Sequence, residues 1–204
     1  MFYETEKNNH GLPFNPFKSC IVPRPIGWIT SLDNAGILNL APYSYFNAVA
    51  DIPPMVIFSS TSKHHDLGVK DTLRNVEETK EFVINIATWD LREAVNISSM
   101  NFDRGISEVE QVKLETIPSH IVKPPRIKNS PIHLECVYFQ SVQLPVIDEK
   151  HTNRMIIGKV VGIHIDDTVI VNGLIDVTKF KPISRLGYSE YSGVESKFIM
   201  ERPT

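Results

Sequence analysis

One run, FSSTSKHHDLGVKDTLRN at residues 58–75, gathers the residue types that bind an oxyanion. Hydroxyl side chains follow a short apolar stretch, and a helical pattern begins after Lys70, at Asp71. Hydroxyl groups, a lysine and the free amides of a helix N-terminus together favour an anion, which we expect to be a phosphate. The alternative is a solvated loop in which Asp71 only caps the helix.

A second run, APYSYFN at residues 41–47, places aromatic rings beside a side-chain amide. A planar heteroaromatic ligand needs this combination, because apolar faces hold the ring and a few hydrogen bonds fix its edge. The alternative is the end of a core strand whose tyrosine reaches solvent. These residues alone leave both interpretations open.

A third run, PISRLGYSEYSG at residues 182–193, combines Arg185 with tyrosines and serines. An arginine can bind a carboxylate or a phosphate through two parallel hydrogen bonds, and the alternative is a surface salt bridge. The adjacent His64 and His65 lie in a polar stretch, so we expect them to be solvated and predict no metal site. The sequence also lacks the glycine-rich nucleotide-binding motifs and the common hydrolase motifs.

The three runs are expected to lie on or beside β-strands. Segments rich in β-branched and apolar residues, separated by turn-forming residues, dominate the chain and predict strands. We expect His133 and His164, which lie on strand patterns, to face solvent or a partner. The predicted strands are Ile26–Leu32, Ile37–Phe46, Pro54–Ser60, Glu81–Ala87, Ile132–Leu144, and a hairpin of Arg154–Ile165 with Thr168–Gly173.

Two helical patterns interrupt the strands. Asp71 can cap a helix over 72–79, and Thr88 can cap a helix over 89–100. Helices do not alternate regularly with strands, which argues against a doubly wound sheet. A closed or partly open antiparallel barrel with helical insertions fits the order of elements better.

Length and composition fit one globular domain of 204 residues with 42% hydrophobic and 22% charged residues. The net charge of −3 argues against a nucleic-acid binder. Cys20 and Cys136 make no disulfide framework, and we expect both to be buried apolar residues. No signal peptide or membrane-spanning segment is recognisable, so we expect a soluble, cytoplasmic protein.

In order along the chain, several motifs resemble the flavin reductase-like proteins with an FMN-binding split barrel. They are PRPIGWITSLDNAGILNLAPYSYFNAVADIPPMVIFSS, KDTLRNVEETKEFVINI, GKVVGIHIDD and PISRLGY, which together span most of the chain. The resemblance implies a mainly β fold, a six-stranded antiparallel Greek-key split barrel with helical insertions. It also implies a single domain over 1–204, with a core of about 18–192, and a homodimer that holds FMN near the subunit interface.

The resemblance assigns residues to the cofactor by matching motifs. The first motif would flank the flavin ring and line the groove, APYSYFN would cradle the ring edge, and FSS with KDT would hold the ribityl chain and phosphate. PISRLGY would approach the cofactor or the nicotinamide. The implied cofactor-binding residues are Arg24, Pro25, Trp28, Thr30, Ser31, Tyr43, Ser44, Tyr45, Phe46, Asn47, Ser59, Ser60, Lys70, Asp71, Thr72 and Arg185.

The function implied by this resemblance is an NAD(P)H-dependent FMN reductase. The flavin would carry the chemistry, so no catalytic side chain is predicted, and NAD(P)H would stack transiently on the exposed flavin face. Reduced flavin would pass to a partner monooxygenase or another acceptor. The alternatives are an electron carrier that retains its FMN, a non-catalytic FMN-binding protein, and a barrel for another phosphorylated ligand.

Overall fold

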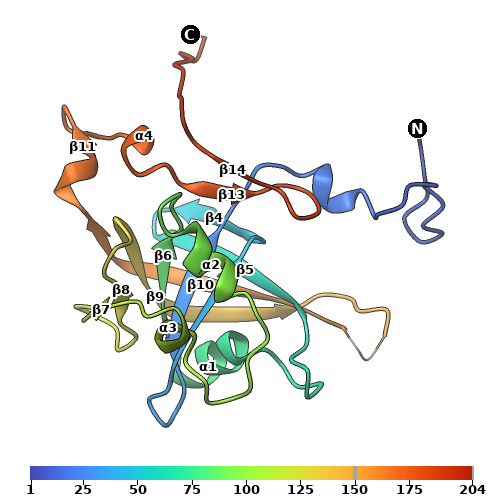
Figure 1. The fold of residues 1–204 in the computed structure, drawn as a ribbon, viewed down its shortest axis with the longest axis horizontal. Helices are drawn as coiled ribbons and strands as arrows, with labels where there is room; N and C mark the ends of the chain where they lie inside the picture. The colour runs from blue at the N-terminus through green and yellow to red at the C-terminus, as the bar shows by residue number, and fades with distance from the viewer. Residues whose placement is uncertain (149–150, 204) are drawn as a thin grey trace.

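A seven-stranded antiparallel sheet forms the centre of the computed structural model, which describes residues 1–148 and 151–203 (Figure 1). The strand order is β3-β2-β6-β9-β10-β5-β4. The predicted mainly β split barrel is confirmed, with one strand more than the six expected. The strands are β2 (Gly27–Leu32), β3 (Leu38–Tyr43), β4 (Phe46–Asp51), β5 (Pro54–Ser62), β6 (Glu81–Ile86), β9 (Ile132–Gln143) and β10 (His151–Ile165).

The extra strand arises where the predicted strand Ile37–Phe46 bends. β3 pairs with β2 and β4 pairs with β5, so the chain between them joins the two edges of the sheet. The amide of Ser59 donates to the carbonyl of Tyr45 at 2.9 Å, which ties this bend to β5. An ideal Cβ on Gly27 would lie 2.9 Å from the Phe46 ring, so β2 and β4 also approach closely. The sheet therefore curls into a barrel that is closed at the bend.

Shorter elements surround the barrel. Figure 1 shows α1 near one end of the curled sheet, and β13 and β14 near the other. None of the helices in the described residues is long and apolar enough to cross a membrane. The remaining elements are η1 (Phe17–Ser19), β1 (Arg24–Pro25), α1 (Asp71–Thr79), α2 (Arg92–Ile97), α3 (Glu108–Gln111), β7 (Thr116–Ile117), β8 (Arg126–Ile127), η2 (Asp167–Val169), β11 (Ile170–Val171), β12 (Leu174–Ile175), α4 (Val177–Phe180), β13 (Ile183–Arg185) and β14 (Tyr191–Gly193).

Both predicted helix caps were wrong. Asp71 is the first residue of α1, and its side chain accepts hydrogen bonds from arginines instead of capping the helix. Thr88 forms a β-bridge with Pro182, and the amide of Trp89 donates to the carbonyl of Lys181 at 3.0 Å. These extended contacts hold residues 88 and 89 outside a helix, so α2 begins only at Arg92.

The predicted hairpin of Arg154–Ile165 with Thr168–Gly173 was also wrong. The Asp166 carboxylate accepts from the amide and hydroxyl of Thr168, at 2.8 and 2.6 Å, and turns the chain into η2. The actual hairpin pairs β11 with β12 across Asn172 and Gly173, whose φ angles are 52° and 78°. An Asn-Gly pair with positive φ angles is the preferred two-residue hairpin turn.

Two apolar clusters hold these elements in place. The first fills the barrel and includes Phe58, Leu73, Phe82 and Ile156, all fully buried. The second lies where the sheet meets α2 and α3. Burial of these side chains supplies the main stabilisation of the fold. α1 is thereby fixed against the barrel, because Leu73 on its inner face belongs to the first cluster.

Expectations about three single residues, His133, His164 and Cys20, were wrong. His133 is buried, its Nε2 lies 2.8 Å from the carbonyl of Ile127, and burial lowers its pKa to about 4. His164 is partly buried and its Nε2 lies 2.5 Å from Glu135. Cys136 is buried as expected, whereas Cys20 is exposed.

Candidate functional site

A cavity of about 240 Å³ lies between the end of β3, the end of β5 and the start of α1. We call it the first cavity. Its lining is dominated by hydroxyl groups, which both donate and accept hydrogen bonds and therefore suit a polyol or an oxyanion. The hydroxyl-bearing residues that line it are Tyr43, Ser44, Tyr45, Ser59, Ser60, Thr61, Ser62, Thr72, Ser98 and Ser99.

The N-terminus of α1 supplies one wall of the first cavity. Lys70, Asp71 and Thr72, which the sequence analysis assigned to an anion site, all line it. The first-turn amides of a helix have no intrahelical partner and carry partial positive charge. Lys70 is partly buried, which lowers the pKa of its ammonium group, and its Nζ donates to Oδ1 of Asn101.

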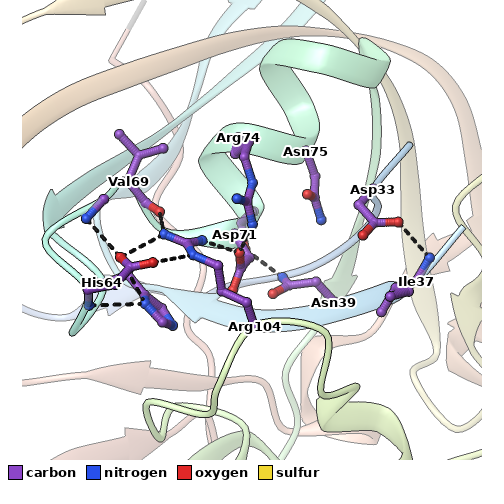
Figure 2. A network of polar contacts seen from close by, with 12 residues as sticks. Asp33, Ile37, Asn39, His64, Val69, Asp71, Arg74, Asn75 and Arg104 are labelled. Carbon is purple, nitrogen blue, oxygen red and sulfur yellow. Dashed lines mark hydrogen bonds and ion pairs between the residues drawn. The ribbon is translucent and has the colours of Figure 1, made fainter. Parts of the chain in front are cut away.

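Arginines neutralise Asp71 at this wall (Figure 2). Arg104 Nη1 lies 2.5 Å from the Asp71 carboxylate, and Arg74 Nη2 contacts the same oxygen. Arg104 also pairs with Asp66 at 2.5 Å through Nε and donates to the carbonyl of Val69 at 3.1 Å. One arginine thus ties the loop after β5 to the start of α1, a contact for which the sequence carries no local signal.

His64 anchors the same loop. It was expected to be solvated, but it is buried and lines the first cavity. Its Nε2 lies 3.0 Å from the carbonyl of Phe102, and its Nδ1 lies 3.1 Å from Asp66. His65 is exposed beside it, as expected. No group of three or more histidine, cysteine, aspartate or glutamate side chains in the part of the chain described here could hold a metal ion.

Glu108 lies in the first cavity although no sequence motif pointed to it. It begins α3, is buried, and accepts from the amide of Leu40 at 2.8 Å. Burial, with a smaller contribution from the nearby Asp71, raises its pKa to about 7, and the hydrogen bond from Leu40 and the charge of Lys70 oppose the shift. This carboxyl group therefore exchanges its proton near neutral pH.

Thr72 and Tyr43 connect the two sides of the first cavity. Asn39 on β3 donates to the Thr72 hydroxyl at 2.7 Å, across to α1. Burial raises the pKa of Tyr43 to about 12, so its phenol stays protonated and can donate a hydrogen bond. The Tyr43 ring also packs against Phe58 in the barrel, with centroids 5.0 Å apart.

A second, wider cavity of about 1270 Å³ adjoins the first, with which it shares Lys18, Pro42, Ser44 and Ser99. Arg24 and Arg185, both predicted site residues, line it. Arg24 is buried, and its guanidinium donates to the carbonyls of Lys18, Ile21 and Leu186. These contacts occupy most of its donors, so its evident role is to hold the chain segments together.

The remaining predicted residues line neither cavity. Trp28, Thr30 and Ser31 are fully buried on β2, and their side chains form hydrogen bonds with other protein groups. Pro25 is exposed in β1. On β4, Phe46 packs against the barrel cluster, while Asn47 is exposed and accepts from the amide of Ala48 at 2.9 Å. The structure thus brings together ten of the sixteen predicted positions along the two cavities.

The flavin reductase like domain model matches residues 19–183 of the chain. An uncharacterised protein of Aquifex aeolicus is 39% identical over 172 residues, 84% of each chain. Among solved structures, nitrilotriacetate monooxygenase component B from Bacillus cereus is 34% identical, with a TM-score of 0.84 and coverage of 97% of this chain and 95% of that one. The 2-nitrobenzoate 2-nitroreductase of Pseudomonas fluorescens is 27% identical, with a TM-score of 0.84 and coverage of 100% and 97%.

Proposed function

The chain belongs to the flavin reductase like domain family, and on this premise we propose that it binds FMN and reduces it with a hydride from NAD(P)H. Family membership supports a flavin reductase or flavin-binding function in general. The observation that carries the finer proposal is the hydroxyl-lined first cavity, which adjoins the wider second cavity. A polyol phosphate fits the first cavity, and a planar ring system needs the space of the second.

The residues of the first cavity fit the ribityl phosphate of FMN. Ser59 and Ser60 on β5 offer hydroxyls to the ribityl chain, and Thr72 adds another from α1. Lys70 and the first-turn amides of α1 offer positive charge to the phosphate. Ser44 lines both cavities, so we place the ring edge near the bend at Ser44 and Tyr45.

The protein contributes position and electrostatics to the reaction. A bound flavin supplies hydride chemistry by itself, so no protein acid or base is required for that step. Hydroxyls and amides at the bend between β3 and β4 would stabilise negative charge on the ring edge. The second cavity would admit the nicotinamide beside the ring.

We propose a homodimer, because one outward face of the barrel is apolar. Ile57 on β5 and Ile157 on β10 are opposite each other in register, and both are half-buried. Val49, Ile52 and Phe139 expose 51%, 93% and 62% of their surface on β4, the turn after it, and β9. Exposed apolar side chains on neighbouring strands are typical of a protein interface.

The reduced flavin must pass its electrons to an acceptor. The Bacillus cereus protein is named as a monooxygenase component, which favours a partner oxygenase here as well. The alternative is a carrier that retains its FMN. Passage of the purified, flavin-loaded protein through a desalting column separates the two, because a diffusible product is lost and a resident cofactor is kept.

Anaerobic titration tests the central proposal. The protein is loaded with FMN, NADH or NADPH is added, and flavin absorbance is followed in a stopped-flow instrument. We expect saturable binding of FMN and bleaching that is faster than with free FMN. FMN binding without faster bleaching would leave a non-catalytic FMN-binding protein, and absence of FMN binding would overturn the proposal.

A further inference from the structure

The second cavity is lined by a distinctive combination of aromatic and cationic residues. Five aromatic residues line it: Tyr3, Phe14, Phe17, Tyr188 and Tyr191. Lys18, Arg24 and Arg185 bring three cations, whereas none of the described residues lining it is acidic. The chain as a whole has more acidic than basic residues, 24 against 21, so this lining departs from the average surface.

We propose that the second cavity binds a planar aromatic anion, and that residues 3–18 form the wall that selects it. Aromatic walls favour a flat ligand, and cations without competing carboxylates favour a negative one. This inference rests on the proposed function, because it places the ligand beside the flavin. It goes further in naming the ligand class and the segment that selects it.

The N-terminal wall is docked onto the loop after β13. Arg24 bridges the two segments, because its guanidinium donates to the carbonyl of Lys18 and, at 2.8 Å, to the carbonyl of Leu186. The Phe14 and Tyr188 rings pack with centroids 5.8 Å apart. An ideal Cβ on Gly187 would lie 1.9 Å from Oγ of Ser19, so the segments touch closely there. The wall is therefore held in place by the protein itself.

Arg185 is the cation best placed to recognise the anion. Its guanidinium lies over the Tyr191 ring, 4.4 Å from the centroid, and donates to the carbonyl of Tyr188. The stacked ring and the carbonyl fix its plane and use only part of its donors. An arginine held in this way presents its remaining N–H groups to a carboxylate.

Three small probes test the ligand class on the FMN-loaded protein. Benzoate is planar and anionic, benzylamine is a similarly sized aromatic cation, and cyclohexanecarboxylate is an anion without a flat ring. Perturbation of the flavin absorbance bands reports binding beside the flavin, independently of turnover. We expect saturable binding of benzoate that is at least about tenfold tighter than binding of either other probe. Equal binding of benzoate and benzylamine would overturn the proposal.

Variants then test the residues. We expect Arg185→Gln and Phe14→Ala each to weaken benzoate binding about tenfold with little change in FMN affinity. Phe2→Ala is the matched control, because Phe2 is 88% exposed and lines neither cavity. Unchanged benzoate affinity in both site variants would contradict the proposal. Retained FMN affinity shows that each variant is folded.

Two further arms separate this proposal from others. Calorimetry with benzoate on flavin-free protein tests ligand binding in the second cavity even if no FMN binds. Failure of the proposed flavin reductase function can therefore be distinguished from failure of this inference. NADH also carries an aromatic ring and negative charge. Displacement of benzoate by NADH would show that both ligands use the same cavity, in agreement with its chemistry. Benzoate binding to neither form of the protein would overturn the inference.

Discussion

At the scale of single residues, pairing decides which charge in the first cavity is available to a ligand. Asp71 and Asp66 are both neutralised by Arg104, at 2.5 Å each. Lys70 forms no ion pair within hydrogen-bonding distance among the described residues, and its Nζ contacts the neutral amide of Asn101. Its positive charge is therefore available to pair with a bound anion.

We expect Lys70→Ala to weaken FMN binding about tenfold while riboflavin binding changes little, because riboflavin lacks the phosphate. Fluorescence titration with both ligands measures the difference. Lys179→Ala is the control, since Lys179 is exposed on α4 and lines neither cavity. Equal losses for FMN and riboflavin would contradict the phosphate assignment.

Glu108 makes stability depend on pH. The folded state holds a proton at Glu108 up to about pH 7, whereas the unfolded chain loses it near pH 4.5. Its contribution to the free energy of unfolding is therefore present below pH 4.5 and lost as pH rises to 7. The full difference is roughly 3 kcal/mol. We expect Glu108→Gln to remove this decline and to be more stable than the unaltered protein at pH 8.

Urea unfolding at pH 5, 7 and 8 measures the effect in both proteins. Glu110→Gln is the control, because Glu110 is an exposed carboxylate in the same helix. A parallel pH dependence in the unaltered protein and in Glu108→Gln would show that another group is responsible.

The residues predicted from the sequence and those missed differ in a physical way. Ser59, Ser60 and Lys70 could be found because their chemistry is concentrated in one continuous run. Glu108 and His64 could not, because their roles come from burial by segments distant in the chain. Burial is a property of the folded structure, and no spacing rule within a short polar segment encodes it.

At the scale of elements, two glycines allow the barrel to be as narrow as it is. Phe82 lies over Gly158 on β10, and Phe46 lies over Gly27 on β2. Each glycine leaves room for an aromatic ring where any side chain would collide. The curl of the sheet, which brings β3 and β5 together around the first cavity, depends on these close approaches.

We expect Gly158→Ala to destabilise the protein by about 1–3 kcal/mol, because overpacking a rigid core forces buried groups to shift. An ideal Cβ at Gly158 would lie 2.4 Å from Cζ of the fully buried Phe82. Thermal unfolding measures the loss as a lower midpoint. Gly193→Ala is the control, since its nearest neighbour is 3.5 Å away on Trp89, an ordinary contact. Similar midpoints for both variants would contradict this account of the barrel.

Element boundaries were harder to predict than element types. The apolar runs correctly indicated strands, but Ile37–Phe46 gave no sign of the bend at Ser44, which depends on pairing with β5. The β11–β12 turn did carry a local signal, the Asn172–Gly173 pair. Chain-local turn chemistry could thus have been predicted, whereas sheet closure could not.

At the scale of the whole molecule, the cavities and the apolar barrel face involve different residues, although β5 and β10 contribute to both. The cavities are lined by residues of the β3–β4 bend, the end of β5, the start of α1, the segment 95–102 and the two terminal segments. The apolar barrel face carries Val49, Ile52 and Phe139, none of which lines either cavity. Phe139 can therefore be altered without touching a residue that lines either cavity, which allows assembly and ligand binding to be tested separately.

We expect the protein in solution to have twice the chain mass of 23.1 kDa, because burial of the apolar face stabilises a dimer. Phe139→Lys places a charge on that face and should shift the mass toward one chain. Light scattering after size-exclusion chromatography measures both states. Leu174→Lys is the matched control, since Leu174 is 73% exposed on β12, in a separate two-stranded sheet. A monomeric unaltered protein would contradict the dimer, and an unchanged dimer in Phe139→Lys would place the interface elsewhere.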